Sequence, residues 1–204
     1  MIQRIYNFLK SIRMLCEQTV NKIMFAYFGV KMEGHPGKIE GIVTVRSQSK
    51  GTITIGSGIQ LRAGKKYNMI GGDTRLILRT YKGGSIRIGK NVGISNSALV
   101  SMNHIEIEDN VMIGGNCKIW DTDFHSLNAD ERMDEYDTHI NSAPIHIKKG
   151  AFIGANTILL KGVTIGEKSI IGAGSVVTKD IPDGQLWAGN PVRYIKKLYV
   201  RENG

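Results

Sequence analysis

The sequence predicts an all-β solenoid, in which the chain winds into a triangular coil of short parallel strands. Between positions 147 and 177 an aliphatic residue returns at every sixth position, and glycine directly follows three of these residues. The chain has 25 glycines and four prolines in 204 residues without a collagen-like period, which indicates many tight turns. A six-residue period fits neither a helix nor a two-faced strand, but it fits three faces of a coil of about 18 residues.

The first 28 residues predict one or two amphipathic helices within a helical segment of residues 1–38. These helices are expected to pack against the first coil or a neighbouring subunit, with attachment to a membrane surface as the alternative. A turn at Gly34-His35-Pro36-Gly37 breaks the helical pattern. The apolar residues share one helical stripe: Ile2, Ile5, Leu9, Ile12, Cys16, Val20 and Ile23.

The coil itself is predicted over residues 39–182. Its aliphatic residues are expected to point into the axis and to stack between coils, while Gly, Asn and Asp form the corners. The clearest row is Ile147, Ile153, Leu159, Ile165, Ile171 and Val177. Upstream the same phase includes Ile88, Ile94 and Val100, then, after one extra residue, Ile107, Ile113 and Ile119, and a weaker copy begins at Ile55 and Leu61.

Two segments depart from the repeat. Residues 121–144 form a charged insertion, which is expected to project from the coil as a loop. Pro182 is expected to end the coil, and residues 183–204 to form a cap. Within the cap, residues 192–201 predict a short basic helix that covers the exposed edge of the last coil.

Composition limits the binding partners and the cellular compartment that the protein can be expected to have. The formal net charge of +9 fits nucleic acid, an anionic membrane or a phosphorylated small molecule. The basic residues are spread along the chain without a nucleic-acid-binding motif, so no nucleic-acid partner is expected. Cys16 and Cys117 lie far apart and outside any redox or metal motif, which indicates free thiols in a reducing compartment. A cytoplasmic location is predicted, with membrane association through the N-terminal helices left open.

Residues 39–197 resemble the hexapeptide-repeat acyltransferases. The resemblance rests on the Ile-Gly repeats, on Trp120-Asp-Thr-Asp-Phe-His125, and on Val177-Thr-Lys-Asp-Ile-Pro182 followed by Ala188-Gly-Asn-Pro-Val-Arg193. Within this family the chain is most similar to sugar and polysaccharide O-acetyltransferases, such as the galactoside and maltose acetyltransferases. The resemblance implies a left-handed parallel β-helix, although physics favours right-handed crossovers. It also implies acetyl-CoA as donor and a homotrimer with its groove between neighbouring prisms.

His125 is the candidate general base. Acyl transfer from a thioester to a hydroxyl needs a base and donors for the tetrahedral oxyanion. A free imidazole, with a pKa near 6.5, can accept the proton and return it to the departing thiolate. His125 lies where the repeat gives way to the loop, and it matches the base of the resembled family. The other four histidines (His35, His104, His139 and His146) are interpreted as having no catalytic task.

Three further residues are candidates for binding the acceptor. Asn96 matches the substrate-orienting asparagine of the galactoside and maltose acetyltransferases, with a plain corner residue as the alternative. Asp121 and Asp123 could orient the imidazole of His125 or bind a sugar hydroxyl, and both could instead be turn formers. The charged loop is expected to select the acceptor.

Acetyl-CoA carries amides and several phosphate charges, which suit a groove edged by small-residue corners and ending in cations. The corners are predicted at Gly154, Ala155, Gly172 and Ala173. Lys179 and Arg193 lie where members of the resembled family bind the CoA phosphates, with simple coverage of the coil's edge as the alternative.

The sequence therefore predicts direct transfer of an acetyl group from acetyl-CoA to a hydroxyl of a sugar or polysaccharide precursor. An N-acetyltransferase acting on an amino sugar nucleotide would use the same base and groove, and a non-catalytic solenoid that binds a partner is a further alternative. A γ-type carbonic anhydrase shares the repeats but needs three histidines converging on zinc. The five histidines are separated by 69, 21, 14 and 7 positions, so no metal is expected.

Overall fold

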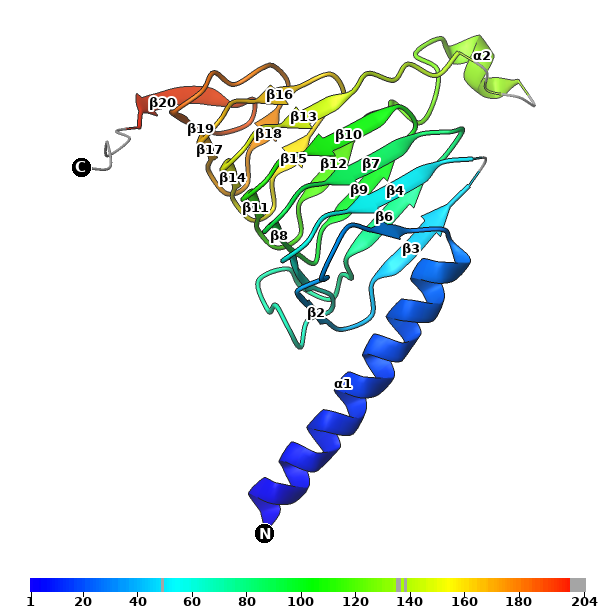
Figure 1. The fold of residues 1–204 in the computed structure, drawn as a ribbon. Coiled ribbons are helices and arrows are strands. Elements are labelled where there is room, and N and C mark those ends of the chain that lie inside the picture. Colours follow the sequence, from blue (N-terminus) through cyan, green and yellow to red (C-terminus); the bar gives the residue numbers. More distant parts are fainter. Residues whose placement is uncertain (49, 135–136, 138, 199–204) are drawn as a thin grey trace.

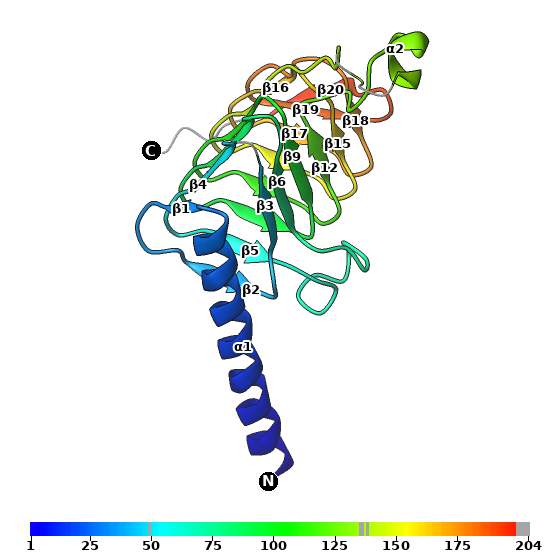
Figure 2. The same cartoon turned by 90° about the vertical axis from the view of Figure 1, so that its right-hand side faces the viewer.

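The computed structural model describes residues 1–48, 50–134, 137 and 139–198. Helix α1 (Ile2–Tyr27) projects from the base of a three-sided coil, whose strands stack from β1 upward to the C-terminal end (Figures 1 and 2). A short helix, α2 (Ala129–Met133), lies in an insertion between two strands of the coil. Each turn of the coil contributes one strand to each of three sheets, termed A, B and C.

The three sheets run the length of the coil, and all neighbouring strands are parallel except the last pair. Sheet A contains β1 (Lys31–Met32), β4 (Thr52–Ile55), β7 (Ser85–Ile88), β10 (His104–Ile107), β13 (Ile145–Ile147) and β16 (Thr164–Ile165). Sheet B contains β2 (Lys38–Glu40), β5 (Gln60–Arg62), β8 (Gly93–Ser95), β11 (Met112–Ile113), β14 (Phe152–Ile153), β17 (Ile170–Ile171), β19 (Gln185–Ala188) and β20 (Arg193–Lys197). Sheet C contains β3 (Thr44–Ser47), β6 (Ile77–Thr80), β9 (Ala98–Ser101), β12 (Lys118–Trp120), β15 (Ile158–Leu159) and β18 (Val176–Val177).

The six-residue aliphatic row forms the core of the coil, as predicted. All six of its residues between positions 147 and 177 have 0% exposure. Their counterparts are in register from coil to coil, as in Ile107, Ile147 and Ile165 of sheet A. Burial of these side chains removes apolar surface from water in every turn, which is the main stabilising contribution in such a stack.

One upstream position of the predicted row is wrong. Leu99, not Val100, is buried at 0% exposure and is in register with Leu78 and Ile119. Val100 points outward because the inward positions of β9 are Leu99 and Ser101. The corner before β9 is one residue shorter than in the next coil, since Leu99 follows Ile94 by five positions whereas their partners Ile119 and Ile113 are six apart.

Both ends of the coil differ from the predicted bounds. The predicted helical segment of residues 1–38 is too long, because α1 ends at Tyr27 and β1 already pairs with β4. Pro182 does not end the coil, since β19 continues sheet B by pairing with β17. The predicted helix at residues 192–201 is also wrong over its described part, where β20 pairs antiparallel with β19. Residues 199–201 lie outside the described part.

Helix α1 is fixed to the first coil by a polar anchor. The side-chain amide of Asn21, which is 3% exposed, donates to the carbonyl of Gly41 and accepts from the N–H of Val43, both at 2.9 Å. Phe25 packs beside it at 7% exposure. The predicted apolar stripe does not make this contact with the chain's own coil, and its Ile23 is 62% exposed.

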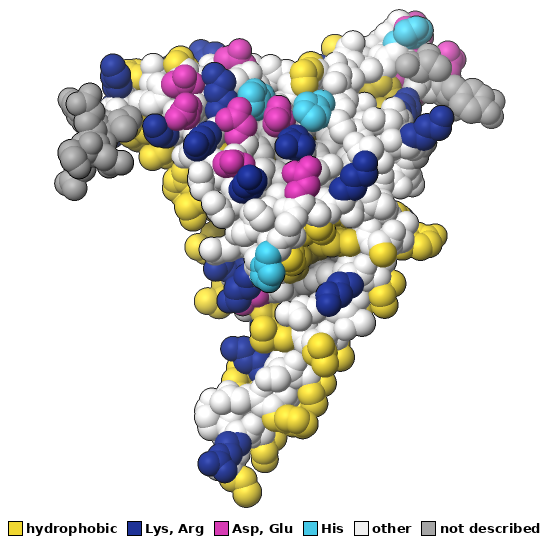
Figure 3. Space-filling model, in the orientation of Figure 1, with side chains coloured by type: hydrophobic (Ala, Val, Ile, Leu, Met, Phe, Trp, Pro, Cys, Tyr) yellow, Lys and Arg dark blue, Asp and Glu magenta, His cyan; other side chains and the backbone are white. Residues whose placement is uncertain are grey.

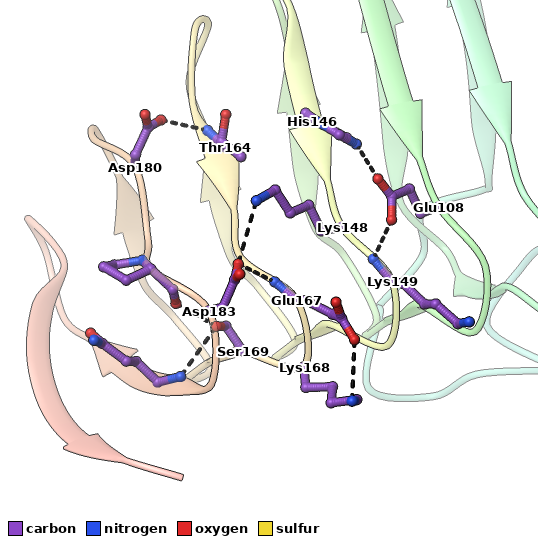
Figure 4. A network of polar contacts seen from close by, with 12 residues as sticks. Glu108, His146, Lys148, Lys149, Thr164, Glu167, Lys168, Ser169, Asp180 and Asp183 are labelled. Carbon is purple, nitrogen blue, oxygen red and sulfur yellow. Dashed lines mark hydrogen bonds and ion pairs between the residues drawn. The ribbon is translucent and has the colours of Figure 1, made fainter. Parts of the chain in front are cut away.

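At the corner between sheets A and B, carboxylates tie one coil to the next (Figure 4). Glu108 accepts the backbone N–H of Lys149 at 2.8 Å, and its other oxygen lies 2.6 Å from Nε2 of His146. Asp183 accepts the N–H of Glu167 at 2.8 Å. That hydrogen bond lowers the pKa of Asp183 against the opposing effect of desolvation. Such bonds satisfy corner amides that the sheets leave unpaired.

Candidate active site

His125 lies at the corner between sheets C and A, where the insertion leaves the coil after β12. Its side chain is 72% exposed, and its Nδ1 lies 2.9 Å from Oδ2 of Asp137. The carboxylate of Asp137 is only 16% exposed and also accepts the backbone N–H of Ser126 at 2.9 Å. The structure therefore pairs the predicted base with a carboxylate that is itself held in place.

The electrostatics of this pair favour an ionised carboxylate. Desolvation acts to raise the pKa of Asp137, but the Ser126 N–H, the His125 ring and the charge of Arg132 together lower it below its usual value. A charged carboxylate facing Nδ1 favours the tautomer with hydrogen on that nitrogen. The lone pair of the ring then lies on Nε2, which is the atom that could accept a proton.

The loop that carries the pair is organised around Ser126, which is 4% exposed. The Ser126 hydroxyl donates to Glu131 at 2.5 Å, and its carbonyl accepts from the guanidinium of Arg132 at 2.7 Å. Asn128 caps α2 by accepting the N–H of Asp130 at 3.0 Å. These contacts connect α2 to the segment that follows His125.

The two aspartates predicted to orient the imidazole do not do so. Asp121 has 0% exposure and accepts three hydrogen bonds from the turn after β9: from the Ser101 hydroxyl at 2.6 Å, the Met102 N–H at 2.7 Å and the Asn103 N–H at 3.0 Å. Its carboxylate is thus used inside the coil, and a contact of Asp121 with a sugar hydroxyl stays a prediction.

Asp123 instead forms an ion pair with Lys161, with Oδ1 and Nζ 2.7 Å apart. Its Oδ2 is buried and has no hydrogen-bond partner among the described residues. Binding of a sugar hydroxyl by Asp123 stays a prediction. Asp137 was missed because it lies twelve positions from His125 in a loop without a repeat, among many other charged residues.

Asn96 is a corner residue whose side chain is used within the coil, and its contact with substrate stays a prediction. It lies between sheets B and C with 0% exposure and a left-handed φ of 42°. Its Oδ1 accepts the N–H of Gly64 at 2.5 Å, and its Nδ2 donates to the carbonyl of Asn68 at 2.9 Å. Both polar atoms of the side chain therefore hold the segment after β5.

The predicted small-residue corners stack on each other along this same B–C corner. A Cβ added to Gly154 would lie 2.5 Å from the backbone nitrogen of Ala173, and one added to Gly114 would lie 2.6 Å from that of Ala155. Only glycine allows backbones to approach so closely. The result is a continuous, closely stacked backbone edge that extends upward through Gly172, where an added Cβ would lie 2.8 Å from Ala188.

The two predicted phosphate-binding cations lie at the upper end of this edge. Arg193 pairs with Ala188, the residue stacked on Gly172. The ammonium of Lys179 lies 5.3 Å from the ring centroid of Trp187, the neighbour of Ala188 in β19. The structure thus brings Gly172, Lys179 and Arg193 together around one strand.

The base and the glycine edge lie at opposite ends of the sheet C strands, so one chain does not bring them together. Between them lies the outer face of sheet C. Residues on this face alternate with buried ones along each strand. Seven of them are apolar: Ile77, Ala98, Val100, Trp120, Ile158, Leu160 and Val176.

The histidines are dispersed over the coil and its loop. His104 and His146 lie on sheet A, His125 and His139 in the insertion, and His35 near the base. In the part of the chain that the structure describes, no group of three or more His, Cys, Asp or Glu side chains is arranged to hold a metal ion.

Comparisons with known proteins identify the repeat. Residues 144–179 match the family model described as bacterial transferase hexapeptide (six repeats), and residues 104–119 match the hexapeptide repeat of succinyl-transferase. A Staphylococcus aureus (strain Mu50 / ATCC 700699) protein whose acetyltransferase assignment is provisional is 47% identical over 74 residues, 36% of each chain. The galactoside O-acetyltransferase of Escherichia coli (strain K12) is 37% identical over 121 residues, 59% of this chain and 58% of that protein.

A solved structure has the same architecture. It is a galactoside acetyltransferase in complex with coenzyme A, 27% identical with a TM-score of 0.52, and the match covers 83% of this chain and 66% of that chain. This chain spans about a third of the length of the Staphylococcus aureus relative and somewhat over half of the Escherichia coli one. The chain therefore contains the hexapeptide repeat of bacterial transferases, and its parallel coil is similar to that of the galactoside acetyltransferase.

Proposed function

We propose that this protein is an acetyl-CoA-dependent O-acetyltransferase that acts on a hydroxyl of a sugar or polysaccharide precursor. The observation that carries the proposal is the pair of His125 and Asp137 at an open corner of the coil, with Nδ1 and Oδ2 2.9 Å apart. The galactoside relatives support the choice of acceptor class, since one is named as an O-acetyltransferase and another was solved with coenzyme A.

In this mechanism Nε2 of His125 takes the proton of the acceptor hydroxyl as its oxygen attacks the thioester carbonyl of acetyl-CoA. The tetrahedral intermediate collapses by breaking the C–S bond, and the imidazolium returns the proton to the CoA thiolate. The products are the acetyl ester and free CoA. Asp137 keeps Nδ1–H oriented and stabilises the imidazolium while it exists.

The glycine edge suits the extended arm of acetyl-CoA. Gly154 and Gly172 leave room for the arm, although their own N–H groups donate to Ile171 and Trp187 within the coil. The backbone N–H groups of the following residues, Ala155 and Ala173, can pair with the pantetheine amides. Lys179 and Arg193 supply positive charge for the phosphates at the upper end of the edge. A reducing compartment such as the cytoplasm stays the predicted location, and it suits the free thiols of Cys16 and Cys117.

A homotrimer would join the two halves of the site. The outer face of sheet C, which carries Arg46, Arg79 and Lys118 beside its apolar residues, lies between His125 and the glycine edge. Burying this face against a neighbour would bring the base of one subunit toward the edge of another. We also propose the left-handed winding that the family resemblance implies.

The test is an assay of thiol release from acetyl-CoA with a panel of sugars, oligosaccharides and amino sugar nucleotides. We expect release that depends on a hydroxyl acceptor, with an ester product that hydroxylamine cleaves. A product that resists hydroxylamine would identify an amide and favour the N-acetyltransferase. Acetyl-CoA binding without turnover on any acceptor would favour a binding module.

Replacing Asp137 with Asn is expected to lower turnover roughly tenfold or more, with little change in the KM for acetyl-CoA, because the orienting charge is lost. In the wild type the pKa of Asp137 is lowered. Its stabilising contribution is therefore complete above the ordinary carboxyl pKa of about 3.9 and is lost only as the pH falls through the lowered value. Initial rates between pH 6 and 8, roughly the range in which imidazole titrates, measure the effect with Asp137 charged.

Asp134→Asn is the matched control, since it removes the same charge from an exposed residue of the same loop. Asp134→Asn should retain turnover, and Asp137→Glu should restore part of it. Equal rates for Asp137→Asn and the wild type would remove Asp137 from its positioning role.

A further inference from the structure

Helix α1 carries an apolar stripe that none of the described residues covers. Along most of its length α1 extends beyond the coil (Figures 1 and 2). Hydrophobic side chains run along one side of it, with Lys and Arg beside them (Figure 3). Exposure is 82% for Ile2, 52% for Ile5, 59% for Leu9, 44% for Ile12 and 62% for Ile23.

The coil holds α1 by a different side of the helix. Asn21 and Phe25 face the first coil, and Glu17 reaches it through the hydroxyl of Tyr67 at 2.6 Å. At 3.6 residues per turn Asn21 and Phe25 lie about a third of a turn or more from the stripe formed by Leu9 and Ile23, and Glu17 lies nearer, about 80° from Leu9. The polar anchor therefore fixes the rotation of the helix about its own axis and directs its apolar stripe away from the coil.

The charged residues in the segment that carries most of the apolar stripe are all basic. Arg4, Lys10 and Arg13 lie among residues 1–16, and this segment contains no Asp or Glu. The first acidic residue, Glu17, lies next to the coil, and Arg13 approaches it at 3.7 Å. The projecting part of α1, about 22 Å long at 1.5 Å per residue, is thus basic as well as amphipathic.

We propose that α1 lies on the surface of an anionic lipid membrane, with the apolar stripe in the acyl boundary and the basic residues among the headgroups. Apolar side chains over about half the circumference with cations beside them are the features of helices that lie in the interface plane. A bundle of identical helices fits less well, because the cations of neighbouring copies would face one another without acidic partners in residues 1–16.

The geometry fixes how the membrane is engaged. Among the described residues, no helix combines the length and apolar character needed to cross a bilayer, so α1 is placed on the membrane and not through it. Because Asn21 ties the end of α1 to the first coil, binding would hold that end of the coil next to the lipid. This inference concerns α1 and does not depend on the proposed reaction.

The test is sedimentation of the full-length protein with vesicles of phosphatidylcholine alone and of a phosphatidylcholine–phosphatidylserine mixture. We expect binding to the mixed vesicles that weakens as salt is added. Leu9→Glu should weaken binding at least about tenfold, since it removes a leucine that the proposal buries in the lipid when α1 binds the membrane. Replacing Arg4 and Lys10 together with Gln should weaken it by about thirtyfold, at roughly 1 kcal/mol for each cation.

Asn7→Glu is the matched control, because it adds the same charge on the polar side of α1 and should weaken binding less than Leu9→Glu. Circular dichroism of both variants checks that they remain folded. Equal binding by Leu9→Glu and Asn7→Glu would overturn the proposal. So would failure of the wild type to bind mixed vesicles, and a fall in solution mass for Leu9→Glu would then assign the stripe to a second copy of the chain.

Discussion

Replacing His125 with alanine is expected to lower turnover by roughly 10²-fold or more while leaving the affinity for acetyl-CoA unchanged. The imidazole supplies general-base catalysis, and its removal forfeits that contribution without touching the glycine edge. His125 is 72% exposed, so its loss leaves no cavity in the coil. Thiol-release rates measure turnover, and isothermal titration with CoA measures binding.

His139→Ala provides the control within the same loop. His139 is similarly exposed, at 77%, and its Nδ1 lies 3.2 Å from Glu131. This variant should retain turnover, since the family resemblance and the contact with Asp137 both single out His125. If His139→Ala lost turnover and His125→Ala kept it, the base would have to be reassigned.

The coil could be predicted from the sequence because every turn repeats the same environment. A residue such as Ile153 is buried against Ile113 and Ile171, so the same side-chain type recurs at a fixed interval and the period is visible. The prediction failed at Val100, because the corner before β9 is one residue shorter and the buried Leu99 follows Ile94 by five positions instead of six. A corner shortened by one residue interrupts the period without leaving a pattern of its own.

The C-terminal strand β20 could not be predicted from local pattern. Three of residues 193–197 are basic, and the segment shows no period-2 burial, since all five residues are exposed. The decisive interaction is non-local: β19 would otherwise present an open edge, and β20 pairs with that edge. An edge is a property of the assembled sheet, so a short window of sequence does not contain it.

Site residues could be predicted where a sequence motif contains them, but not where their role depends on the hydrogen bonds that the fold provides. His125 follows from its segment and from its place at the end of the repeat. Asn96 and Asp121 have residue types suited to substrate binding, yet their polar atoms are used by backbone groups far along the chain. Only the fold shows which amides a buried carboxylate or carboxamide accepts.

Replacing Asp121 with alanine is therefore expected to lower the free energy of unfolding by about 3 kcal/mol or more. The substitution removes the acceptor of the Ser101 hydroxyl and of the N–H groups of Met102 and Asn103. Buried donors left without partners cost about 1–3 kcal/mol each, although some of the three will reach water after the change. Denaturant-induced unfolding of variant and wild type measures the difference.

Asp123→Ala is the matched comparison, because the two carboxylates are neighbours in sequence but differ in burial. Asp123 forms a partly exposed ion pair with Lys161, and loss of such a pair costs up to about 1 kcal/mol. The Asp121 and His125 variants then separate two kinds of residue: Asp121→Ala should unfold more readily, whereas His125→Ala should lose turnover at nearly unchanged stability. If Asp121→Ala kept its stability and lost turnover, Asp121 would act in the reaction, and its role as an internal acceptor for the coil would be refuted.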